Sequence, residues 1–507
     1  MTDLIVPPQI NFSRYSKTTP KYNYLKVQID NQASANVNLT ATTNPRIDFK
    51  LPSSVINLAK SYLSFTISSV PASGTANVLT VLQEDAVAIL ENVQVGFGAN
   101  ADLMNITSAA NWTKVWNPLA HDMDQFLRNN TDSYFHKAQD SKLFAAVALS
   151  GATAPVSLLP SGSLSQNIPA SNTSAGAGPG NCYGYQYTKD ANDYTRVITV
   201  SGAQASINPI GPNEPQHLIV GKNNATTGPI HKRIPLSQIG GFLSTDKDIF
   251  TQNDMYIRLT LSNIAKLGHR ENLDTGAKTA IAGTVYLTNF YLFVAVEANN
   301  DIANAVLEQY RNGGIKFQID QVVPFFTTLP ASSSVNQQYT INRSFGKYLK
   351  FALTSFFGAN ELTGAGEEYD NQNVNGDKIV WYRTSVNGSY LQPENIYCYD
   401  PTNTNLNGDE LLVCDWVRDS LTNSVYEYDA SYMANFTIID NFAHCVDMPE
   451  LGIKKSDVGC GLDLDNLNNS NLVYQIQLNT DATAYRAYTY FVFSRECIIS
   501  PSGITLE

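Results

Sequence analysis

Histidine is the side chain best suited to acid–base chemistry near neutral pH, but it needs a second functional group nearby. The six histidines of this 507-residue chain are far apart: His121, His136, His217, His231, His269 and His444. The sequence contains no Gly-x-Ser-x-Gly elbow and no His-Glu-x-x-His motif. Cys445 follows His444, but no partner pair occurs at metal-ligand spacing, so a buried thiol is the simpler interpretation.

One glycine-rich segment, residues 96–101 (GFGANA), imitates a dinucleotide-binding loop. Such a loop binds phosphate only where it connects a strand to a helix in an alternating α/β fold. No such alternation surrounds this segment. The pattern therefore favours a turn between two strands.

Two asparagine-rich segments, residues 371–376 and 403–408, imitate the first half of a calcium loop. Both lack an acid at the first position, and Tyr382 and Cys414 stand where a bidentate glutamate is needed. The acids of residues 463–465 are interpreted as a solvated turn. We therefore assign no metal ligand to these segments.

Adjacent carboxylates could serve a glycosidase, which uses two of them. Glu367-Glu368 and Asp409-Glu410 are the available pairs, but neighbouring acids in a loop are usually solvated. Asparagine sequons also occur, as expected of an asparagine-rich chain, at Asn38, Asn105, Asn111 and Asn435 among others. The sequence thus predicts no catalytic, cofactor-binding or metal-binding residue, no cofactor and no enzyme.

Six cysteines are present, at Cys182, Cys398, Cys414, Cys445, Cys460 and Cys497. None forms a Cys-x-x-Cys pair, and residues 1–21 lack the apolar core of a signal peptide, so free thiols are expected. No apolar stretch reaches about 18 residues, so no transmembrane helix is expected.

The composition favours a chain that packs against copies of itself. Hydrophobic residues make up 43% and charged residues only 15%, and the net charge is −12. A surface so poor in charge resists aggregation weakly when it stands alone. An acidic chain without basic runs is also unsuited to direct binding of nucleic acid.

The elements that would position these residues are strands, and the chain repeats them. Two matches carry alternating apolar and polar residues: residues 24–30 (YLKVQID) with 314–320 (GIKFQID), and 62–69 with 348–355. Two more follow in the same order, 257–261 with 474–478 and 286–297 with 485–496. Strands use few residue types, so chance similarity is the alternative. Four ordered matches favour two tandem copies of one β fold.

The offsets between the matches fall from 290 to 286, 217 and 199. Copy one therefore carries about 69 extra residues between Tyr62 and Ile257 and 18 more before Tyr286. Residues 150–180, rich in Ser, Ala, Gly, Pro and Asn, fit the first excess.

The expected domain organisation has three parts. Residues 1–20 form an N-terminal arm, and residues 21–299 form the first β domain with a large loop insertion around 140–230. Residues 300–507 form a linker helix and the second β domain, with long loops around 357–440. Helical patterns are few: residues 118–128, and residues 301–311, which Asn312-Gly313-Gly314 ends.

On these repeated strands and the linker helix, the chain resembles the double jelly-roll major capsid proteins of double-stranded DNA viruses, the adenovirus and giant-virus lineage, most of all those of Sputnik-type virophages. The resemblance covers nearly the whole chain and rests on architecture, without a signature motif. It implies an all-β fold of two tandem eight-stranded jelly rolls, with long loop insertions and a short linker helix.

The resemblance also implies a function. Homotrimers would form pseudo-hexameric capsomers, or hexons, that tile an icosahedral shell. Their partners would be neighbouring capsomers and penton and minor capsid proteins. The protein would reside in the virion, after assembly in the host cytoplasm or a virus factory. The alternative is a glycan-binding β-sandwich spike or lectin-like protein; a β-sandwich glycosidase is a third possibility.

Overall fold

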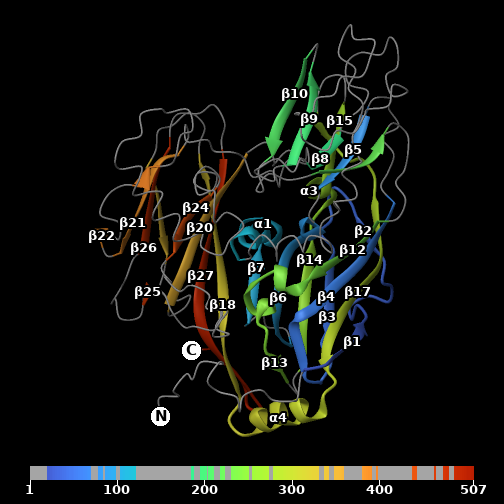
Figure 1. The fold of residues 1–507 in the computed structure, drawn as a ribbon, viewed down its shortest axis with the longest axis vertical. Helices are drawn as coiled ribbons and strands as arrows, with labels where there is room; N and C mark the ends of the chain where they lie inside the picture. Colours follow the sequence, from blue (N-terminus) through green and yellow to red (C-terminus); the bar gives the residue numbers. More distant parts are fainter. Residues whose placement is uncertain are drawn as a thin grey trace.

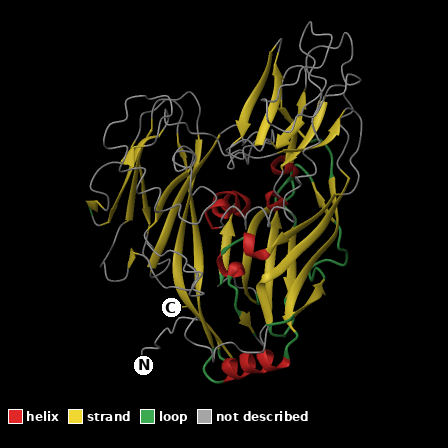
Figure 2. Ribbon diagram, in the orientation of Figure 1, coloured by secondary structure: helices red, strands yellow, loops and turns green. Residues whose placement is uncertain are grey.

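The computed structural model describes most of the strand framework. The described residues are 20–69, 78–83, 86–98, 103–120, 184–187, 195–201, 204–210, 217–222, 230–250, 254–272, 278–329, 336–341, 348–358, 379–386, 388–390, 396–397, 437–441, 462–463, 472–478 and 485–506. Figure 2 shows two β sandwiches side by side, with a helix below them and another between them.

The first sandwich has two four-stranded sheets at its centre. One has the order β1 (Tyr22–Val27), β17 (Val285–Glu297), β4 (Ile56–Ser69) and β12 (Ile230–Pro235). The other has the order β3 (Arg46–Lys50), β14 (Met255–Leu261), β6 (Leu90–Phe97) and β7 (Met104–Thr107). Two short strands, β2 (Val37–Leu39) and β13 (Asp248–Ile249), extend the first sheet.

The order of these eight principal strands defines the fold. The first pairs with the eighth, the second with the seventh, the third with the sixth and the fourth with the fifth, all antiparallel. This is the path of a long hairpin wound around a barrel, which is a jelly roll.

Further strands lie at the end of the first sandwich that is remote from α4 (Asn300–Arg311) (Figure 1). One sheet has the order β11 (His217–Lys222), β5 (Val78–Gln83), β15 (Gly268–Asn272) and β16 (Lys278–Ala280). The other contains β10 (Gln204–Ile210), β9 (Thr195–Ser201) and β8 (Gly184–Tyr187).

The second sandwich repeats the same winding. Its inner sheet has the order β18 (Ile315–Leu329), β27 (Tyr485–Ser500), β20 (Tyr348–Gly358) and β24 (Thr437–Asn441). Its outer sheet contains β19 (Asn336–Ile341), β26 (Leu472–Leu478), β21 (Ile379–Val386), β22 (Ser389–Tyr390) and β23 (Ile396–Tyr397). Two short strands, β25 (Leu462–Asp463) and β28 (Gly503–Leu506), border β20 and β27. The expected fold, two tandem jelly rolls, is confirmed.

The repeated sequences fall on equivalent strands. The four matches pair β1 with β18, β4 with β20, β14 with β26, and β17 with β27. These are the first, third, seventh and eighth strands of each winding. The matched segments therefore lie on equivalent strands of two windings of the same topology.

The helices agree with expectation at one place and differ at another. The helix expected over 301–311 is α4, which begins after Asn299, whose side chain accepts a hydrogen bond from the backbone of Asp301. Of the helix expected over 118–128, the described residues 118–120 belong to α1 (Ala109–Ala120), which begins nine residues earlier. Residues 121–128 lie outside the described part of the chain, as does the expected arm except residue 20.

Among the described residues, one large hydrophobic core contains buried side chains of both sandwiches. In β17 buried and partly exposed residues alternate, so one face of its sheet is open. In β27 every residue from Ala487 to Phe493 is buried, so both faces of its sheet are covered. The two equivalent sheets therefore have different surroundings, although their winding is the same.

Candidate assembly surfaces

The residues whose side chains could carry chemistry do not come together in the described structure. The glycine-rich segment 96–101 follows β6, and the next described strand, β7, pairs with β6 antiparallel. Gly98 takes a left-handed conformation and donates its backbone N–H to Asp254. The antiparallel pairing agrees with the expected turn between two strands, and the described residues between β6 and β7 include no helix at which a phosphate could bind.

The histidines and cysteines give no site either. His231 contacts Thr66 through its ring Nδ1, at 2.7 Å from the hydroxyl. His217 and His269 lie on β11 and β15, and the other three histidines are outside the described residues. Cys497 is a buried free thiol, and the other five cysteines are outside the described residues. Within the described part of the chain, no three His, Cys, Asp or Glu side chains form a metal-binding group.

The two calcium-like segments, the paired acids and Asn435 also lie outside the described residues. Of the remaining sequons, Asn38 and Asn105 are exposed, whereas Asn111 is buried in α1. Asp463 ends β25. Among the described helices, none is long and apolar enough to cross a membrane.

The two sandwiches meet at a junction, and α1 lies between them there (Figure 1). Trp112 is fully buried, and its indole N–H donates to the carbonyl of Ile239 at 2.7 Å. Its ring lies 5.3 Å from the ring of Tyr490 on β27 and 5.0 Å from that of Trp116. Trp116 in turn meets Phe351 of β20 edge to face. Aromatic contacts of this kind add to the hydrophobic free energy of burial.

Burial at the junction also perturbs Tyr490. Loss of contact with water raises the pKa of its phenol well above the usual value, and the neighbouring Tyr488 raises it further. Its hydroxyl donates a long hydrogen bond to the carbonyl of Ser108, which precedes α1. The phenol therefore stays neutral and joins the two sandwiches.

A second part of the junction lies nearer to α4, where η6 (Gly241–Ser244) meets β18. The rings of Phe242 and Phe317 lie 6.0 Å apart. Beside them, buried Lys350 donates to Asp320 at 2.7 Å, with side-chain exposures of 1% and 10%. A buried ion pair is costly to form but more costly to break, because one partner would keep an uncompensated charge.

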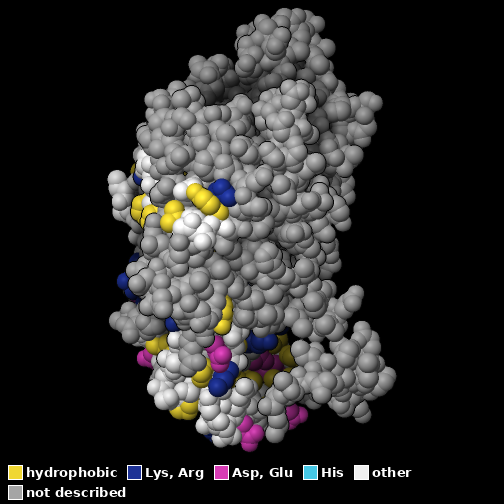
Figure 3. All heavy atoms as spheres, turned by 90° about the vertical axis from the view of Figure 1, so that its left-hand side faces the viewer, with side chains coloured by type: hydrophobic (Ala, Val, Ile, Leu, Met, Phe, Trp, Pro, Cys, Tyr) yellow, Lys and Arg dark blue, Asp and Glu magenta, His cyan; other side chains and the backbone are white. Residues whose placement is uncertain are grey.

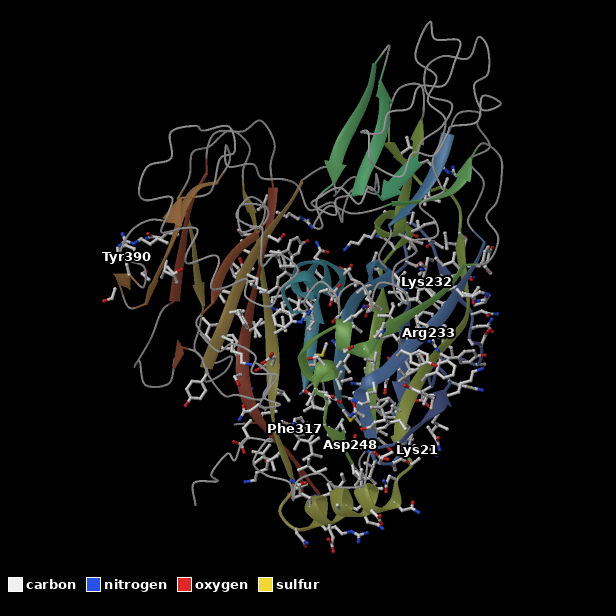
Figure 4. The ribbon with its side chains drawn as sticks, in the orientation of Figure 1. Lys21, Lys232, Arg233, Asp248, Phe317 and Tyr390 are labelled. Atoms are coloured by element: carbon white, nitrogen blue, oxygen red, sulfur yellow. The ribbon has the colours of Figure 1, made fainter. Side chains whose placement is uncertain are left out.

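A polar network fixes the start of the first sandwich above α4. Asn57 donates to Asp246, Asp248 and the hydroxyl of Tyr22. Burial, together with the hydrogen bond from its own hydroxyl to Asp248, raises the pKa of Tyr22 above its usual value. Glu297 accepts from the backbone N–H of Lys21 at 3.0 Å, so β1 is anchored where it begins (Figure 4).

The opposite side of the first sandwich carries what we call the open face, the outer surface of sheet β1-β17-β4-β12. It is formed by Tyr24, Lys26, Tyr62, Arg233, Tyr291 and Phe293. Tyr62 stacks on Phe293 at 5.0 Å and contacts Tyr24 at 5.4 Å. Arg233 lies over Tyr62 and donates to its hydroxyl, and Lys26 lies over Tyr291. The side chains are thus held in place, yet Tyr24 remains 53% exposed.

Exposed aromatic residues also occur on the second sandwich, at Phe325 and Phe326 of β18 and at Tyr390 of β22. Tyr390 is 47% exposed, and the guanidinium of Arg383 lies 3.7 Å from its ring centre. On the side turned to the viewer in Figure 3, hydrophobic and basic side chains lie next to each other among the described atoms.

Sequence reasoning missed both the junction and the open face. For the junction, Trp112 and Trp116 recur at helical spacing, and this signal was available. For the open face there was no signal, because Tyr291 and Tyr490 belong to the same sequence match. One is partly exposed and the other is fully buried.

The fold places the chain in a class. Two jelly rolls of identical winding, joined by one helix, make it a double jelly-roll protein. No family model matches the sequence, and no curated protein matches it.

Solved structures match over nearly the whole chain. One is VP54 of PBCV-1, whose crystal structure was fitted into a reconstruction of the virophage Sputnik; it is 10% identical, with a TM-score of 0.54 and coverage of 97% of both chains. Another is the Faustovirus major capsid protein, 11% identical, with a TM-score of 0.53 and coverage of 96% of this chain and 92% of that one. The PBCV-1 capsid model is 10% identical, with a TM-score of 0.51. At these identities the likeness establishes the fold, which is that of viral double jelly-roll capsid proteins.

Proposed function

We propose that this protein is the structural major capsid protein of a double-stranded DNA virus and has no enzymatic activity. The observation that carries the proposal is the repeated winding: two jelly rolls of the same topology, fixed side by side in one chain by a buried junction. Their likeness to capsid proteins over 96–97% of this chain supports it.

The physical basis of the proposal is symmetry. Three chains around an axis present six similar sandwiches, so a threefold trimer acquires a nearly hexagonal outline. Hexagonal units tile a shell with little open space between them. The partners of each trimer would be its neighbouring capsomers and the penton and minor capsid proteins. The protein would reside in the virion, after assembly in the host cytoplasm or a virus factory, and a virophage is the expected source.

The test is the mass of the purified full chain in solution, followed by electron microscopy of the same sample. We expect particles of three times 55.6 kDa with a hexagonal outline, or closed shells. A monodisperse monomer at micromolar concentration would overturn the proposal. Binding of that monomer on a glycan array would then support the lectin-like alternative.

A further inference from the structure

The end of α4 carries a pair of residues that can react with each other. In an Asn-Gly pair, the backbone nitrogen of the glycine can attack the side-chain carbonyl carbon of the asparagine. Four such pairs occur in the chain, at residues 312–313, 375–376, 387–388 and 407–408, and the first lies entirely within the described residues. We propose that Asn312 is a site of spontaneous deamidation, and that the product loosens the turn from α4 into β18. This modification takes place within one chain and does not depend on the proposed function.

The reaction consumes only water. A bond forms between the backbone nitrogen of Gly313 and Cγ of Asn312, which closes a five-membered imide ring. The bond from Cγ to the side-chain nitrogen breaks, and this nitrogen leaves as ammonia with the proton of the Gly313 amide. Water then adds to one of the two ring carbonyls and opens the ring. One opening gives aspartate, and the other gives isoaspartate, whose main chain runs through Cβ and Cγ.

The attacking nitrogen is accessible in the folded chain. Asn312 and Gly313 are both exposed. The N–H of Asn312 donates to the carbonyl of Glu308 at 2.9 Å, and that of Gly314 donates to Gln309 at 3.1 Å. Within the described part of the chain, the N–H of Gly313 between them has no hydrogen-bond acceptor. Water can therefore remove its proton without breaking the end of the helix.

The turn also has the freedom that ring closure needs. Asn312 must rotate about the bond between its Cα and its carbonyl carbon, and it already lies outside the regular helix, with φ −99° and ψ 27°. Gly313 must follow this rotation. It has a φ of +134°, and nothing lies within 4 Å of the place where a Cβ would stand. A glycine without neighbours moves easily between backbone conformations.

The product matters because both ends of the turn are fixed. On the α4 side, Tyr310 is buried, and its ring meets that of Phe250 edge to face at 5.0 Å. On the β18 side, Gly314 is so close to β27 that a Cβ there would lie 2.9 Å from Cγ2 of Ile498. Isoaspartate inserts one more carbon, about 1.5 Å of main chain, between these anchors. The last turn of α4 or the start of β18 must then shift.

The new charge acts in the same direction. The carboxylate would stand at the C-terminus of α4, where the helix dipole already places partial negative charge. Glu308 lies four residues earlier on the helix, so the two carboxylates would repel each other. Arg311 is exposed, and water screens the attraction that it could offer. Aspartate and isoaspartate therefore both weaken this end of the helix.

The first test follows Asn312 in the purified full chain, incubated at mildly alkaline pH in water labelled with heavy oxygen. Pepsin digestion at acidic pH avoids new deamidation during preparation. Mass spectrometry should then find heavy oxygen in the peptide that contains residue 312, with isoaspartate as the main product. The matched sample is the same chain unfolded in urea. If Asn312 kept its amide in the folded chain while it reacted in urea, the turn would protect it and the proposal would be wrong.

The second test measures the effect on stability. The control variant is Asn312→Gln, whose longer side chain cannot close a five-membered ring, while the other three Asn-Gly pairs remain. We expect incubation to lower the melting temperature of the unaltered chain by at least roughly 2 °C more than that of the variant. Fresh Asn312→Asp carries the charge without the extra carbon and should melt between the two. Equal losses in both chains, with residue 312 converted in the unaltered one, would show that the turn tolerates the product and would overturn its proposed effect.

Discussion

Lys350 and Asp320 illustrate what buried polar residues do in this protein. Their ion pair is almost completely removed from water at the junction. We predict that Asp320→Asn lowers the free energy of unfolding by about 3 kcal/mol, because Lys350 would keep a buried charge without a carboxylate. The measurement is equilibrium unfolding in urea.

The control for this prediction is the exposed pair of Lys50 and Asp254. A hydrogen bond from Lys50 to this carboxylate raises the pKa of Lys50, but both side chains are about half exposed. Exposed pairs contribute little, because water and salt screen them. Asp254→Asn should therefore leave the urea midpoint unchanged. Equal losses for Asp254→Asn and Asp320→Asn would show that burial is not the cause.

Cys497 should make the protein sensitive to alkali. Burial raises the pKa of its thiol from 9.0 to about 12. Below pH 9 the thiol is protonated in both the folded and the unfolded chain, and the full stability is present. Between pH 9 and pH 12 only the unfolded chain loses the proton, so the free energy of unfolding falls as the pH rises.

From this thiol alone, we expect a loss of about 1.4 kcal/mol between pH 8 and pH 10. Urea unfolding at the two pH values measures it. Cys497→Ala should lose less stability than the unaltered chain over this interval, by that amount. Identical pH dependence in the two chains would mean that the thiol is not protected from water.

At the scale of elements, the turn that ends α4 contains two glycines with different constraints. A Cβ at Gly314 would lie 2.9 Å from Cγ2 of Ile498 and 3.0 Å from the carbonyl oxygen of Ile499. At Gly313 nothing lies within 4 Å, although both residues have positive φ. We predict that Gly314→Ala costs about 3 kcal/mol or more, from strain and overpacking together. Gly313→Ala should cost only about 1–2 kcal/mol, from strain.

Thermal unfolding of these two variants measures the difference, and their matched position in one turn removes other causes. If both lost the same stability, the close approach of β27 to this turn would not be energetically important. The turn matters because it directs the chain from α4 into β18, the first strand of the second sandwich.

The sequence predicted which strands correspond but not how they align. The matches assign Ile315 to Leu25. In the first sandwich, Leu25 pairs with Val294 on the neighbouring strand. The match assigns Val294 to Phe493, and in the second sandwich Phe493 pairs with Gln321, not with Ile315. The alignment is thus shifted by six residues. A period of two fixes the face of a strand, and any even shift preserves that face.

The helices show the same limit. The linker helix was predictable because it has a cap at Asn299 and glycines beyond its end. The other expected helix, over 118–128, overlaps the described helix α1 only at residues 118–120, and α1 begins at Ala109. Proline fits a first turn best, yet Pro118 is among the last residues of α1, whose Trp112 and Trp116 pack at the junction.

At the scale of the whole molecule, the continuous core predicts that the two sandwiches unfold together. Trp112→Ala should cost about 3–5 kcal/mol and weaken the junction more than either sandwich. We therefore expect one calorimetric transition for the unaltered chain and two for this variant. A single transition at lower temperature in the variant would place the effect of Trp112 inside the first sandwich.

The candidate surfaces could not be predicted from the sequence, because exposure depends on what covers a face. Tyr291 and Tyr490 occupy matched positions, and only the presence of α1 above one of them separates a core residue from an open one. The sequence pattern of a strand carries no information about α1, because α1 belongs to the other sandwich.

The helix that joins the sandwiches has a kinetic consequence. In the proposed trimer, the junction between the two sandwiches is made within one chain. A short tether holds such partners at an effective concentration on the order of millimolar, whatever the amount of protein in the cell. The contact between copies has no tether and depends on the supply of newly made chain. The rate of synthesis therefore determines when trimers form, whereas the arrangement of the two sandwiches within each chain is already fixed.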